Sequence, residues 1–289
     1  MTHLDLSATA MQPASTSAPD RRHFKAIVDD GKPILIKDAV RHWPAITRWS
    51  LDHVADVAGA RRVPVEFYPE GNYYTGWLSF ETTLKRYLEL AVQAADETPG
   101  PRYYLAEVRI DERLPELMQD IELPGFIDPA LLEYSGLFLG RDTITGLHYH
   151  ATDQALLCQI RGTKHLLLYP PQDFRHLYFE PWYSHRFNFS RIDFGRLDLA
   201  RFPELRRATP LVCTLHPGDA CFIPIHWGHV VEGEGTNASV TFFWRAQRRH
   251  WAAHPVSAHA LAGHRFRAWV TRPLARRLSD WFRYRVAID

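Results

Sequence analysis

The chain has 289 residues, of which 46% are hydrophobic and 23% charged, so it can bury a sizeable core. The 34 basic and 33 acidic side chains leave a net charge of +1, which gives no global bias toward nucleic acid. Without a long apolar run or a basic leader, neither a membrane span nor a signal peptide is expected. We expect a cytoplasmic protein in which Cys158, Cys213 and Cys221 are buried, reduced thiols, because their spacing is not that of a zinc site.

The N-terminal third mixes predicted helices and strands. Residues 1–20 are rich in Ser, Thr, Ala and Pro, which predicts a disordered leader. The apolar run over 33–37 predicts a strand. Ser50 is expected to cap a helix over 51–58, which ends at a left-handed Gly59.

Further elements are expected before residue 135. Residues 63–68 and 103–108 have the composition of strands, and Pro64 places the first at a sheet edge or a strand start. Residues 80–95 have helical periodicity. Residues 109–134 are expected to form short helices and loops.

From about residue 136 to 245 the pattern changes to short β runs separated by turns. The predicted strands are 136–139, 146–150, 154–160, 165–169, 211–215, 220–223, 229–232 and 239–244. The turn signals are Gly162, Pro170-Pro171, 217–219 and 233–235. This pattern favours a barrel or a sandwich. Residues 172–210 interrupt it, and a loop of that length is usually functional, often a lid or a substrate surface.

Residues 256–289 are predicted to be helical and basic, with a break at Pro273. The apolar stripe consists of Leu261, Phe266, Trp269, Val270, Leu274, Leu278, Trp281 and Phe282. We expect these helices to pack on the barrel or on a second subunit, and the arginines between them to be solvated. A nucleic-acid or anionic-membrane surface is the weaker interpretation.

The clearest chemical signal lies in Gly146-Leu147-His148-Tyr149-His150 together with His229. On a strand, His148 and His150 point to one face. A turn, a β run and a proline precede His229 and would deliver its side chain into a barrel mouth. Three protein ligands leave coordination positions open, which indicates a catalytic rather than a structural metal.

Most of the sixteen histidines must be ordinary surface or core residues. His226 lies three residues before His229 and would face the opposite way on a continuous strand, so it is not expected to be a ligand. Asp153 could supply a carboxylate in place of His150 only if the chain bent between them.

The block GLHYHATDQALLCQIRGTKHLLLYPP, followed by HPGDACFIPIHWGHVV, resembles the JmjC and cupin-like Fe(II)/2-oxoglutarate-dependent oxygenases. The resemblance is to the asparaginyl-hydroxylase type that includes the factor inhibiting hypoxia-inducible factor, and it extends from about Lys32 to Trp244. It implies a mainly β protein with flanking helices (α+β), built on a double-stranded β-helix. The expected organisation is a leader over 1–20, the cupin/JmjC-like domain with N-terminal α/β elements over 21–250, and a helical extension over 251–289 through which a homodimer could form.

The resemblance also implies an iron site. His148 and His229 match the two histidine ligands, and His150 stands where the family has an aspartate. The exchange removes a negative charge from the metal's ligands, so the site should still hold an anionic 2-oxo acid. It also suits Zn, Ni or Cu.

A cosubstrate site is implied in the same way. Lys164, Thr145 and Tyr104 match the residues that bind the far carboxylate of 2-oxoglutarate. Gln154 and Thr241 occupy positions where the family often has asparagine. Taken singly, Lys164 could be a surface lysine and Tyr104 a core aromatic residue. An ammonium group inside a barrel, however, gives a charge-assisted bond to a carboxylate.

The sequence therefore predicts a 2-oxoglutarate-dependent dioxygenase that hydroxylates a C–H bond of a peptide or protein side chain, or of a small metabolite. Tyr149 and the 172–210 segment are expected to line the substrate path, with Trp182 and Tyr183 as contacts. Two alternatives stay open. One is a three-histidine metalloenzyme that does not use 2-oxoglutarate, either a dioxygenase or a hydrolase or isomerase. The other is a non-catalytic binding module with a structural metal.

Overall fold

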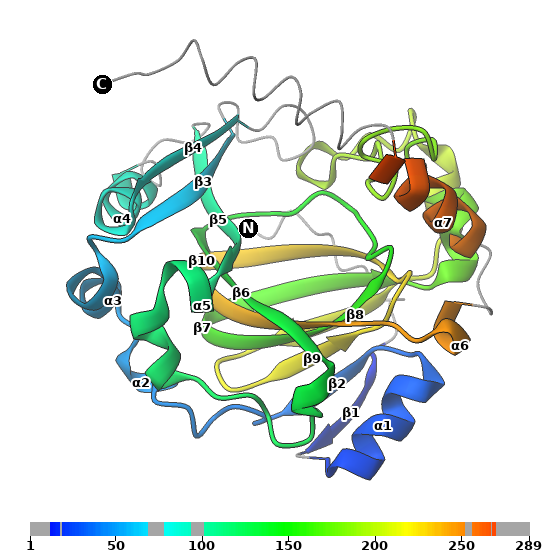
Figure 1. Ribbon diagram of the computed structural model, residues 1–289. Coiled ribbons are helices and arrows are strands. Elements are labelled where there is room, and N and C mark those ends of the chain that lie inside the picture. The colour runs from blue at the N-terminus through cyan, green and yellow to red at the C-terminus, as the bar shows by residue number, and fades with distance from the viewer. Residues whose placement is uncertain are drawn as a thin grey trace.

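The computed structural model describes residues 12–17, 19–68, 78–93, 101–251, 256–266 and 268–269. Ten strands in this part of the chain form one sheet, in the order β1-β2-β9-β7-β10-β6-β5-β3-β4 with β8 paired to β7 (Figure 1). The strands are β1 (Ala14–Ser17), β2 (Ile34–Lys37), β3 (Arg62–Tyr68), β4 (Leu78–Thr83), β5 (Arg102–Arg109), β6 (Leu132–Arg141), β7 (Asp153–Tyr169), β8 (Leu211–Leu215), β9 (Ala220–Ile223) and β10 (Gly228–Arg245).

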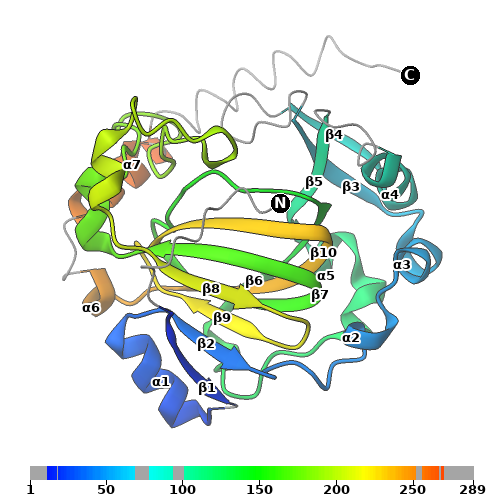
Figure 2. The ribbon, with the colours of Figure 1, turned by 180° about the vertical axis from the view of Figure 1, so that it is seen from behind.

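Helices flank the sheet at both ends. In Figures 1 and 2, α3 and α4 lie at one end of the sheet, and α6 and α7 lie at the other. The α-helices are α1 (Arg21–Asp30), α2 (Ala45–Arg48), α3 (Leu51–Ala58), α4 (Leu84–Gln93), α5 (Ile110–Arg113), α6 (Arg248–Trp251) and α7 (Val256–Phe266). Short 3-10 helices are η2 (Pro115–Asp120), η3 (Pro129–Leu131), η4 (Pro171–His176), η5 (Phe194–Arg196) and η6 (Pro203–Arg207).

The two longest strands, β7 and β10, each take part in two halves of the sheet. Residues 153–159 of β7 pair with β9 and with 239–245 of β10. Residues 163–169 of β7 pair with β8 and with 228–234 of β10. We call the first set, together with β1 to β6, the major half of the sheet. The second set, which consists of residues 163–169 of β7, residues 228–234 of β10 and β8, is the minor half.

Both long strands are irregular where the halves meet. Gly162 has φ 72°, and the register of β10 shifts between Glu234 and Ala238. A Cβ on Gly162 would lie 2.4 Å from the carbonyl oxygen of Thr236, so only glycine fits there. The turns predicted at Gly162 and at 233–235 are wrong, because the strands continue through these positions and bend at bulges. Two half-sheets joined by continuous, bent strands form the predicted double-stranded β-helix.

The segment between β6 and β7 carries two of the predicted metal ligands but is not the regular strand predicted over 146–150. It forms isolated bridges, two of which join His148 to His229 of β10 and to Phe189 of the insert 172–210. The ligand-bearing segment therefore lies between the minor half and the insert. Because it pairs with β10 on one side and with the insert on the other, it does not form an exposed edge.

The N-terminal predictions hold for three strands and fail in detail elsewhere. The strands predicted over 33–37, 63–68 and 103–108 are confirmed as β2, β3 and β5. Ala14–Ser17 pairs in parallel with β2, so the disordered leader is wrong for these residues, while residues 1–11 lie outside the described part.

Helix α3 begins as predicted, since the Ser50 hydroxyl accepts a hydrogen bond from the backbone N–H of His53. Gly59, however, has φ −58° and is right-handed, so the left-handed end predicted for α3 is wrong. The helix predicted from Phe80 begins only at Leu84, because residues 78–83 pair with β3 as β4. Here pairing with a neighbouring strand overrides local periodicity.

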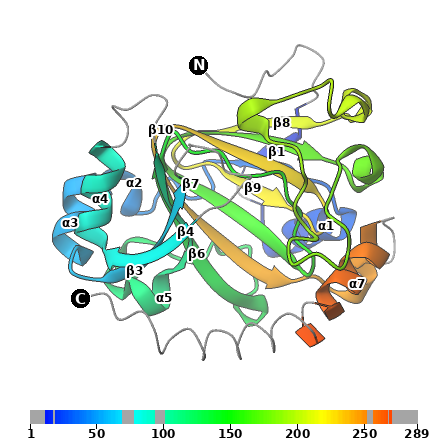
Figure 3. The ribbon, with the colours of Figure 1, turned by 90° about the horizontal axis from the view of Figure 1, so that it is seen from above.

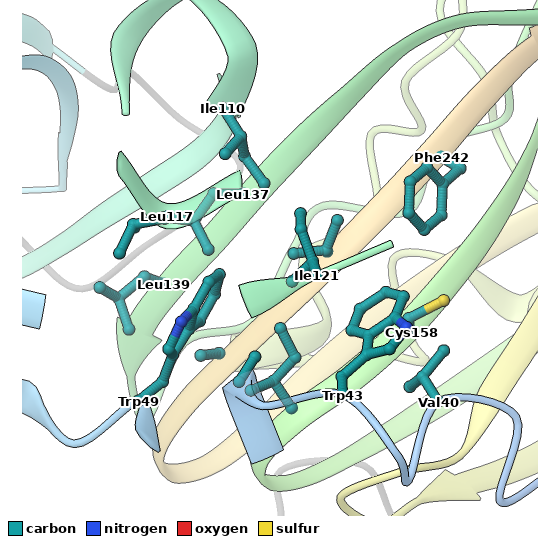
Figure 4. Packing of buried hydrophobic residues seen from close by; sticks show 14 of the residues in the cluster. Val40, Trp43, Trp49, Ile110, Leu117, Ile121, Leu137, Leu139, Cys158 and Phe242 are labelled. Atoms are coloured by element: carbon teal, nitrogen blue, oxygen red, sulfur yellow. The ribbon is translucent and has the colours of Figure 1, made fainter. Parts of the chain in front are cut away.

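The largest hydrophobic cluster lies between the major half and the N-terminal helices. Figure 4 shows Trp43 and Trp49 packed among side chains of the sheet, such as Leu137 and Phe242. A second cluster joins inward-facing residues of both halves, including Leu157 and Leu166. The three cysteines are buried and form no disulfide, as predicted.

The insert covers the outer face of the minor half. Its Ile192 and Phe202 belong to one buried cluster with Leu167, Val212 and Val230 of the minor half. Figure 3 shows this green to yellow-green segment beside β8 and close to α7. The insert is therefore a packed layer and not a loose connection.

Helix α7 confirms the first part of the C-terminal helical prediction. Its Val256 and Ala260 pack against Tyr149 and Phe187. The stripe residues from Val270 onward lie outside the described part of the chain. Among the described helices, none has the length and hydropathy that crossing a bilayer demands.

Replacing Gly140 with alanine should destabilise the protein. A Cβ at this position of β6 would lie 2.7 Å from both Thr143 Cγ2 and Tyr104 Cδ2, so a ring in the core must move. We expect the free energy of unfolding in urea to fall by about 1–3 kcal/mol. The control is Gly125→Ala, where no described atom lies within 4 Å of the new Cβ. Equal effects of the two substitutions would contradict the crowding at Gly140.

Candidate metal centre

The structure brings His148, His150 and His229 together. The nitrogen atoms that they offer to a metal lie within 4.8 Å of one another. The ring centroids of His148 and His229 are 4.1 Å apart, and those of His150 and His229 are 4.7 Å apart. The predicted triad is thus a cluster that can hold one metal ion.

Backbone pairing explains this convergence. The N–H of His148 donates to the carbonyl of His229 at 3.1 Å, and the N–H of His229 donates back at 2.7 Å. Residues paired in this way project their side chains to the same face. The carbonyl of His150 accepts the N–H of His226 at 3.2 Å, which fixes the third ligand.

Two of the rings are held in a defined tautomer. Nδ1 of His148 lies 2.9 Å from the carbonyl oxygen of Gly146, and Nδ1 of His229 lies 3.0 Å from that of Trp227. A carbonyl can only accept, so both Nδ1 atoms carry the proton and both Nε2 atoms keep a lone pair for a metal. Nδ1 of His150 is buried and has no hydrogen-bond partner among the described residues.

The site keeps the imidazoles neutral. Removal from water lowers the pKa of His148 and of His229, and it lowers the pKa of His150 to about 3, with a further contribution from His148. Neutral imidazole is the form that binds a metal, so no proton has to be displaced near neutral pH.

Neither of the two neighbouring candidates joins the cluster. The ring of His226 packs against Trp251, with centroids 5.3 Å apart, which agrees with the prediction that it is not a ligand. Asp153 accepts a hydrogen bond from Thr152 and faces Arg245 at 3.9 Å. The triad of the described residues therefore contains imidazoles and no carboxylate.

Phe189 of the insert covers one side of His148. The two rings are stacked, with centroids 5.2 Å apart and an angle of 17° between their planes. The guanidinium carbon of Arg186 lies 5.0 Å from the centroid of the Phe189 ring. The insert thereby shields a metal ligand from water and restricts its rotation.

Lys164 is a buried lysine at the far end of the interior. It lies opposite Gly233 in the pairing of β7 with β10, four residues along β10 from His229. Its ammonium donates to the hydroxyl of Ser239 at 2.5 Å and lies 5.6 Å from the centroid of the Phe138 ring. Burial lowers its pKa to about 7. A surface lysine is excluded, because 2% of the residue is exposed.

Thr145 and Tyr104 lie between the triad and Lys164. The hydroxyl of Thr145 accepts the N–H of Val231 at 2.9 Å, and Val231 lies between His229 and Gly233 on β10. The Tyr104 ring lies 6.2 Å from that of Phe138, the ring beneath the Lys164 ammonium. Three residues from separate elements thus surround one space.

Thr241 faces the same interior. It alternates on β10 with Ser239, which holds Lys164, so both side chains point to one face. Its hydroxyl is buried and has no hydrogen-bond partner among the described residues. A buried hydroxyl without a partner is costly, so it indicates an absent polar ligand.

Gln154, which the resemblance matches to a cosubstrate residue, does not face this interior. Its amide accepts from Trp244 Nε1 at 3.1 Å and lies 3.0 Å from Nδ1 of His250. Because side chains alternate along β7, it is Ala155 that belongs to the interior cluster. Neighbouring residues on a strand point to opposite faces, so Gln154 and Ala155 lie on different sides of β7.

A cavity of about 210 Å³ opens beside His148. Its lining includes Tyr104 and Thr145, and also two acids that were not predicted, Glu66 of β3 and Glu107 of β5. Burial raises the pKa of both carboxyl groups, although a hydrogen bond from a tyrosine to each acts in the opposite direction. The cavity thus combines a metal-ligand wall with two acids.

The sequence contained a signal for these acids. Glu66 and Glu107 each interrupt a short apolar run predicted to be a strand, in VPVEFY and YYLAEV. Glu107 has φ 57° and lies in a β-bulge of β5. Gly136 permits this bulge, because a Cβ there would lie 3.2 Å from the Cα of Glu107. Bulges of this kind redirect side chains near functional sites.

None of the three side chains predicted as substrate contacts lines this cavity. Tyr149 is fully buried, and its ring points away from the metal side, toward α7. Trp182 and Tyr183 are exposed and are not among the described residues that line the cavity. Phe189 is the residue of the insert that lines it.

The residues present fit a divalent transition metal and a 2-oxo acid. Three neutral imidazoles suit Fe, Zn, Ni or Cu. A buried ammonium and an unpartnered hydroxyl, together with Thr145 and Tyr104, fit an anionic molecule rich in oxygen acceptors. The orientation of the two ring nitrogens toward a common point favours the metal independently of the cosubstrate.

Comparison with known proteins agrees with this geometry. Residues 20–250 match the cupin-like domain family. The Danio rerio protein named lysine-specific demethylase 8 is 32% identical over 238 residues, which are 78% of this chain and 56% of that protein. Lysine-specific demethylase JMJ30 of Arabidopsis thaliana is 32% identical over 222 residues, or 74% of this chain and 50% of that protein. The chain spans about half the length of these relatives.

A relative with a different name is covered more fully. The tRNA wybutosine-synthesizing protein 5 of Danio rerio is 29% identical over 253 residues, which are 81% of this chain and 74% of that protein. The relatives therefore share the domain while their names point to different substrates. The particular likeness to the asparaginyl-hydroxylase type stays a prediction.

Each triad histidine should be needed for metal binding. We expect His148→Ala, His150→Ala and His229→Ala each to weaken Co²⁺ binding by roughly 100-fold or more, because changes that act on ligands only indirectly already cost 10- to 100-fold. Isothermal titration calorimetry measures the affinity, and His216→Ala, at an exposed position, is the control. Wild-type affinity of His150→Ala for Co²⁺ would mean that only His148 and His229 bind the metal.

Proposed function

This chain belongs to the cupin-like domain family, and on that premise we propose that it is an Fe(II)- and 2-oxoglutarate-dependent oxygenase with a three-histidine metal site. JmjC members of this family use Fe(II) and 2-oxoglutarate. The observation that carries the proposal is the common interior shared by the imidazole triad and the buried Lys164 ammonium. Such a lysine has no role in a purely structural metal site.

His148, His150 and His229 would hold the metal, and Lys164 would bind the far carboxylate of 2-oxoglutarate. When bound, Fe(II) and 2-oxoglutarate supply the oxidising chemistry, in which O₂ is reduced while the 2-oxo acid loses CO₂. A bound carboxylate stabilises the protonated form of Lys164 and thereby offsets the effect of burial on its pKa.

The hydroxyl groups around Lys164 complete the anion site. Thr145 and Tyr104 line the cavity beside His148, and Thr241 shares a face of β10 with Ser239. In the proposed site their hydroxyls would donate to carboxylate oxygens of 2-oxoglutarate. Phe189 and Phe138 would exclude water from that space. The protein's task is to orient the reactants and keep them dry.

The cavity beside His148 favours a cationic substrate group. Glu66 and Glu107 provide two acids, and the aromatic side chains of Tyr68, Phe138 and Phe189 line the same space. An ammonium or guanidinium group is attracted both by carboxylates and by aromatic faces. A bound cation would lower the pKa of both carboxyl groups, which opposes the effect of burial.

We propose that the substrate is a lysine- or arginine-like side chain of a peptide or protein, or a small amine. The reaction is hydroxylation of a C–H bond near the cation. If the oxidised carbon is an N-methyl, the C–N bond of the resulting N-hydroxymethyl group would break and release formaldehyde. An RNA backbone fits less well, because the same acids would repel phosphates. The three reduced thiols agree with a reducing compartment such as the cytoplasm.

One observation favours a second candidate. No carboxylate among the described residues joins the triad. A metalloenzyme that binds its substrate directly to a three-histidine metal, without 2-oxoglutarate, would have this ligand set. In that case Lys164 would bind an anionic substrate instead.

Lys164→Met separates these candidates. Anaerobic addition of Fe(II) and 2-oxoglutarate to the wild type should produce a weak visible charge-transfer band. The variant should bind 2-oxoglutarate roughly 10- to 150-fold more weakly, the value of one charge-assisted hydrogen bond. The exposed Lys85→Met is the control. Metal binding in the wild type without any band would favour the second candidate.

The acids should select a positive charge. N-acetyl-arginine methylamide is expected to increase succinate formation, and the citrulline analogue, which has nearly the same shape but no charge, is not. Glu66→Gln and Glu107→Gln should each weaken the response roughly 10-fold, because each removes one charge-assisted contact. The exposed Glu89→Gln is the matched control. A stronger response to citrulline than to arginine would refute a cationic substrate.

A further inference from the structure

Tyr149 lies between two metal ligands but takes no part in the metal site. Its side chain points to the opposite face of the chain from His148 and His150, as alternation requires. There its hydroxyl lies 2.8 Å from Nδ1 of His259, a residue of α7. The link therefore joins the ligand-bearing segment to the C-terminal helix.

The second nitrogen of His259 extends the link. Nε2 lies 2.9 Å from the carbonyl oxygen of Glu180 in the insert, and a carbonyl only accepts, so Nε2 carries the proton. Nδ1 of the neutral ring then accepts a hydrogen bond from the Tyr149 hydroxyl. Burial lowers the pKa of His259 and raises that of Tyr149, which keeps both groups in these forms near neutral pH.

His259 thus connects two segments that lie on either side of residues 188–190 of the insert. Tyr149 N–H donates to the carbonyl of Asn188 at 3.1 Å, and Glu180 N–H donates to that of Phe189 at 2.8 Å. Residues 188–190 of the insert therefore lie between Glu180 and Tyr149. A single imidazole bonds to both ends of this arrangement.

Packing holds α7 at the same place. Val256 and Ala260 share a buried cluster with Tyr149 and Phe187. Gly263 has no space for a side chain, because a Cβ would lie 2.3 Å from the Phe187 ring. The helix is therefore seated closely on the back of the ligand-bearing segment.

We propose that His259 is a positioning residue of the metal centre and that α7 belongs functionally to the catalytic domain. The inference rests on the proposed metal site. The ligand-bearing segment is held by isolated bridges and not by a continuous ladder, so side-chain anchoring adds to the backbone hydrogen bonds that set its orientation. Metal ligands tolerate displacements of only about 0.5 Å, and a released Tyr149 would let the His148 and His150 side chains turn.

Two conservative variants test the link in the full chain. Tyr149→Phe removes one oxygen atom, and His259→Leu removes the acceptor with little change in volume. With Co²⁺ alone as the probe, we expect each to weaken binding roughly 10-fold and to change the visible absorption of the bound ion. The double variant should be no weaker than the weaker single variant, because both remove the same bond.

Controls separate positioning from general stability. His259→Gln keeps an acceptor and a donor and should restore most of the affinity and the wild-type spectrum. His185→Leu makes the same substitution at an exposed position of the insert and should change nothing. Wild-type affinity and spectrum in both Tyr149→Phe and His259→Leu overturn the proposal, and so do fully additive effects.

A second readout does not depend on the metal. Hydrogen exchange of the backbone amides at 147–150 should accelerate in metal-free Tyr149→Phe and His259→Leu, and not in His185→Leu. If the wild type fails to bind Co²⁺, the proposed function fails, while the exchange rates still decide the role of His259. Unchanged exchange in both variants refutes it.

Discussion

The reciprocal pair of backbone hydrogen bonds between His148 and His229 is the constraint on which the site depends. It sets two rings side by side with their centroids 4.1 Å apart, although the residues are 81 positions apart in the chain. Everything else about the triad follows from local geometry, since His150 lies two residues farther along on the same face. The fold therefore specifies the metal centre through main-chain pairing, before any side chain is considered.

Electrostatics then divides the interior into regions of different character. The uncharged imidazoles of the triad suit a metal cation, and the ammonium group of Lys164 suits an anion. The carboxyl groups of Glu66 and Glu107 suit a second cation. Each of these groups is costly to bury alone. Three such groups around one interior are understandable when their ligands bind together, because each ligand offsets the desolvation of the group that it meets.

The sequence predicted most of what short-range rules and the family resemblance control. The triad, Lys164, Thr145 and Tyr104 all face one interior, since motif spacing on strands determines their faces. Gln154 points away from this interior, because a step of a single residue along a strand reverses the face to which a side chain points. Neither the register of β7 nor the location of its bulge can be read from composition alone.

Other failures have a common cause in long-range pairing. Gly162 has the composition of a turn, yet β10 pairs with β7 on both sides of it and turns it into a bulge. Residues 78–83 have helical periodicity, yet β3 recruits them as a strand. Tyr149 was expected to contact substrate, but its partner His259 lies 110 residues away, and no local pattern reveals such a bond.

The continuity of β7 and β10 through both halves of the sheet has a mechanical consequence. Because the same two strands run through the major and the minor half, no flexible linker joins the halves, and we do not expect them to separate as rigid bodies about a hinge. A substrate would instead enter through the cavity beside His148, which residues of β3, β5 and the insert line. We therefore expect the shape and charge of this entrance to determine which substrates bind. Differences in substrate among relatives should then follow from sequence differences at the residues that line the entrance.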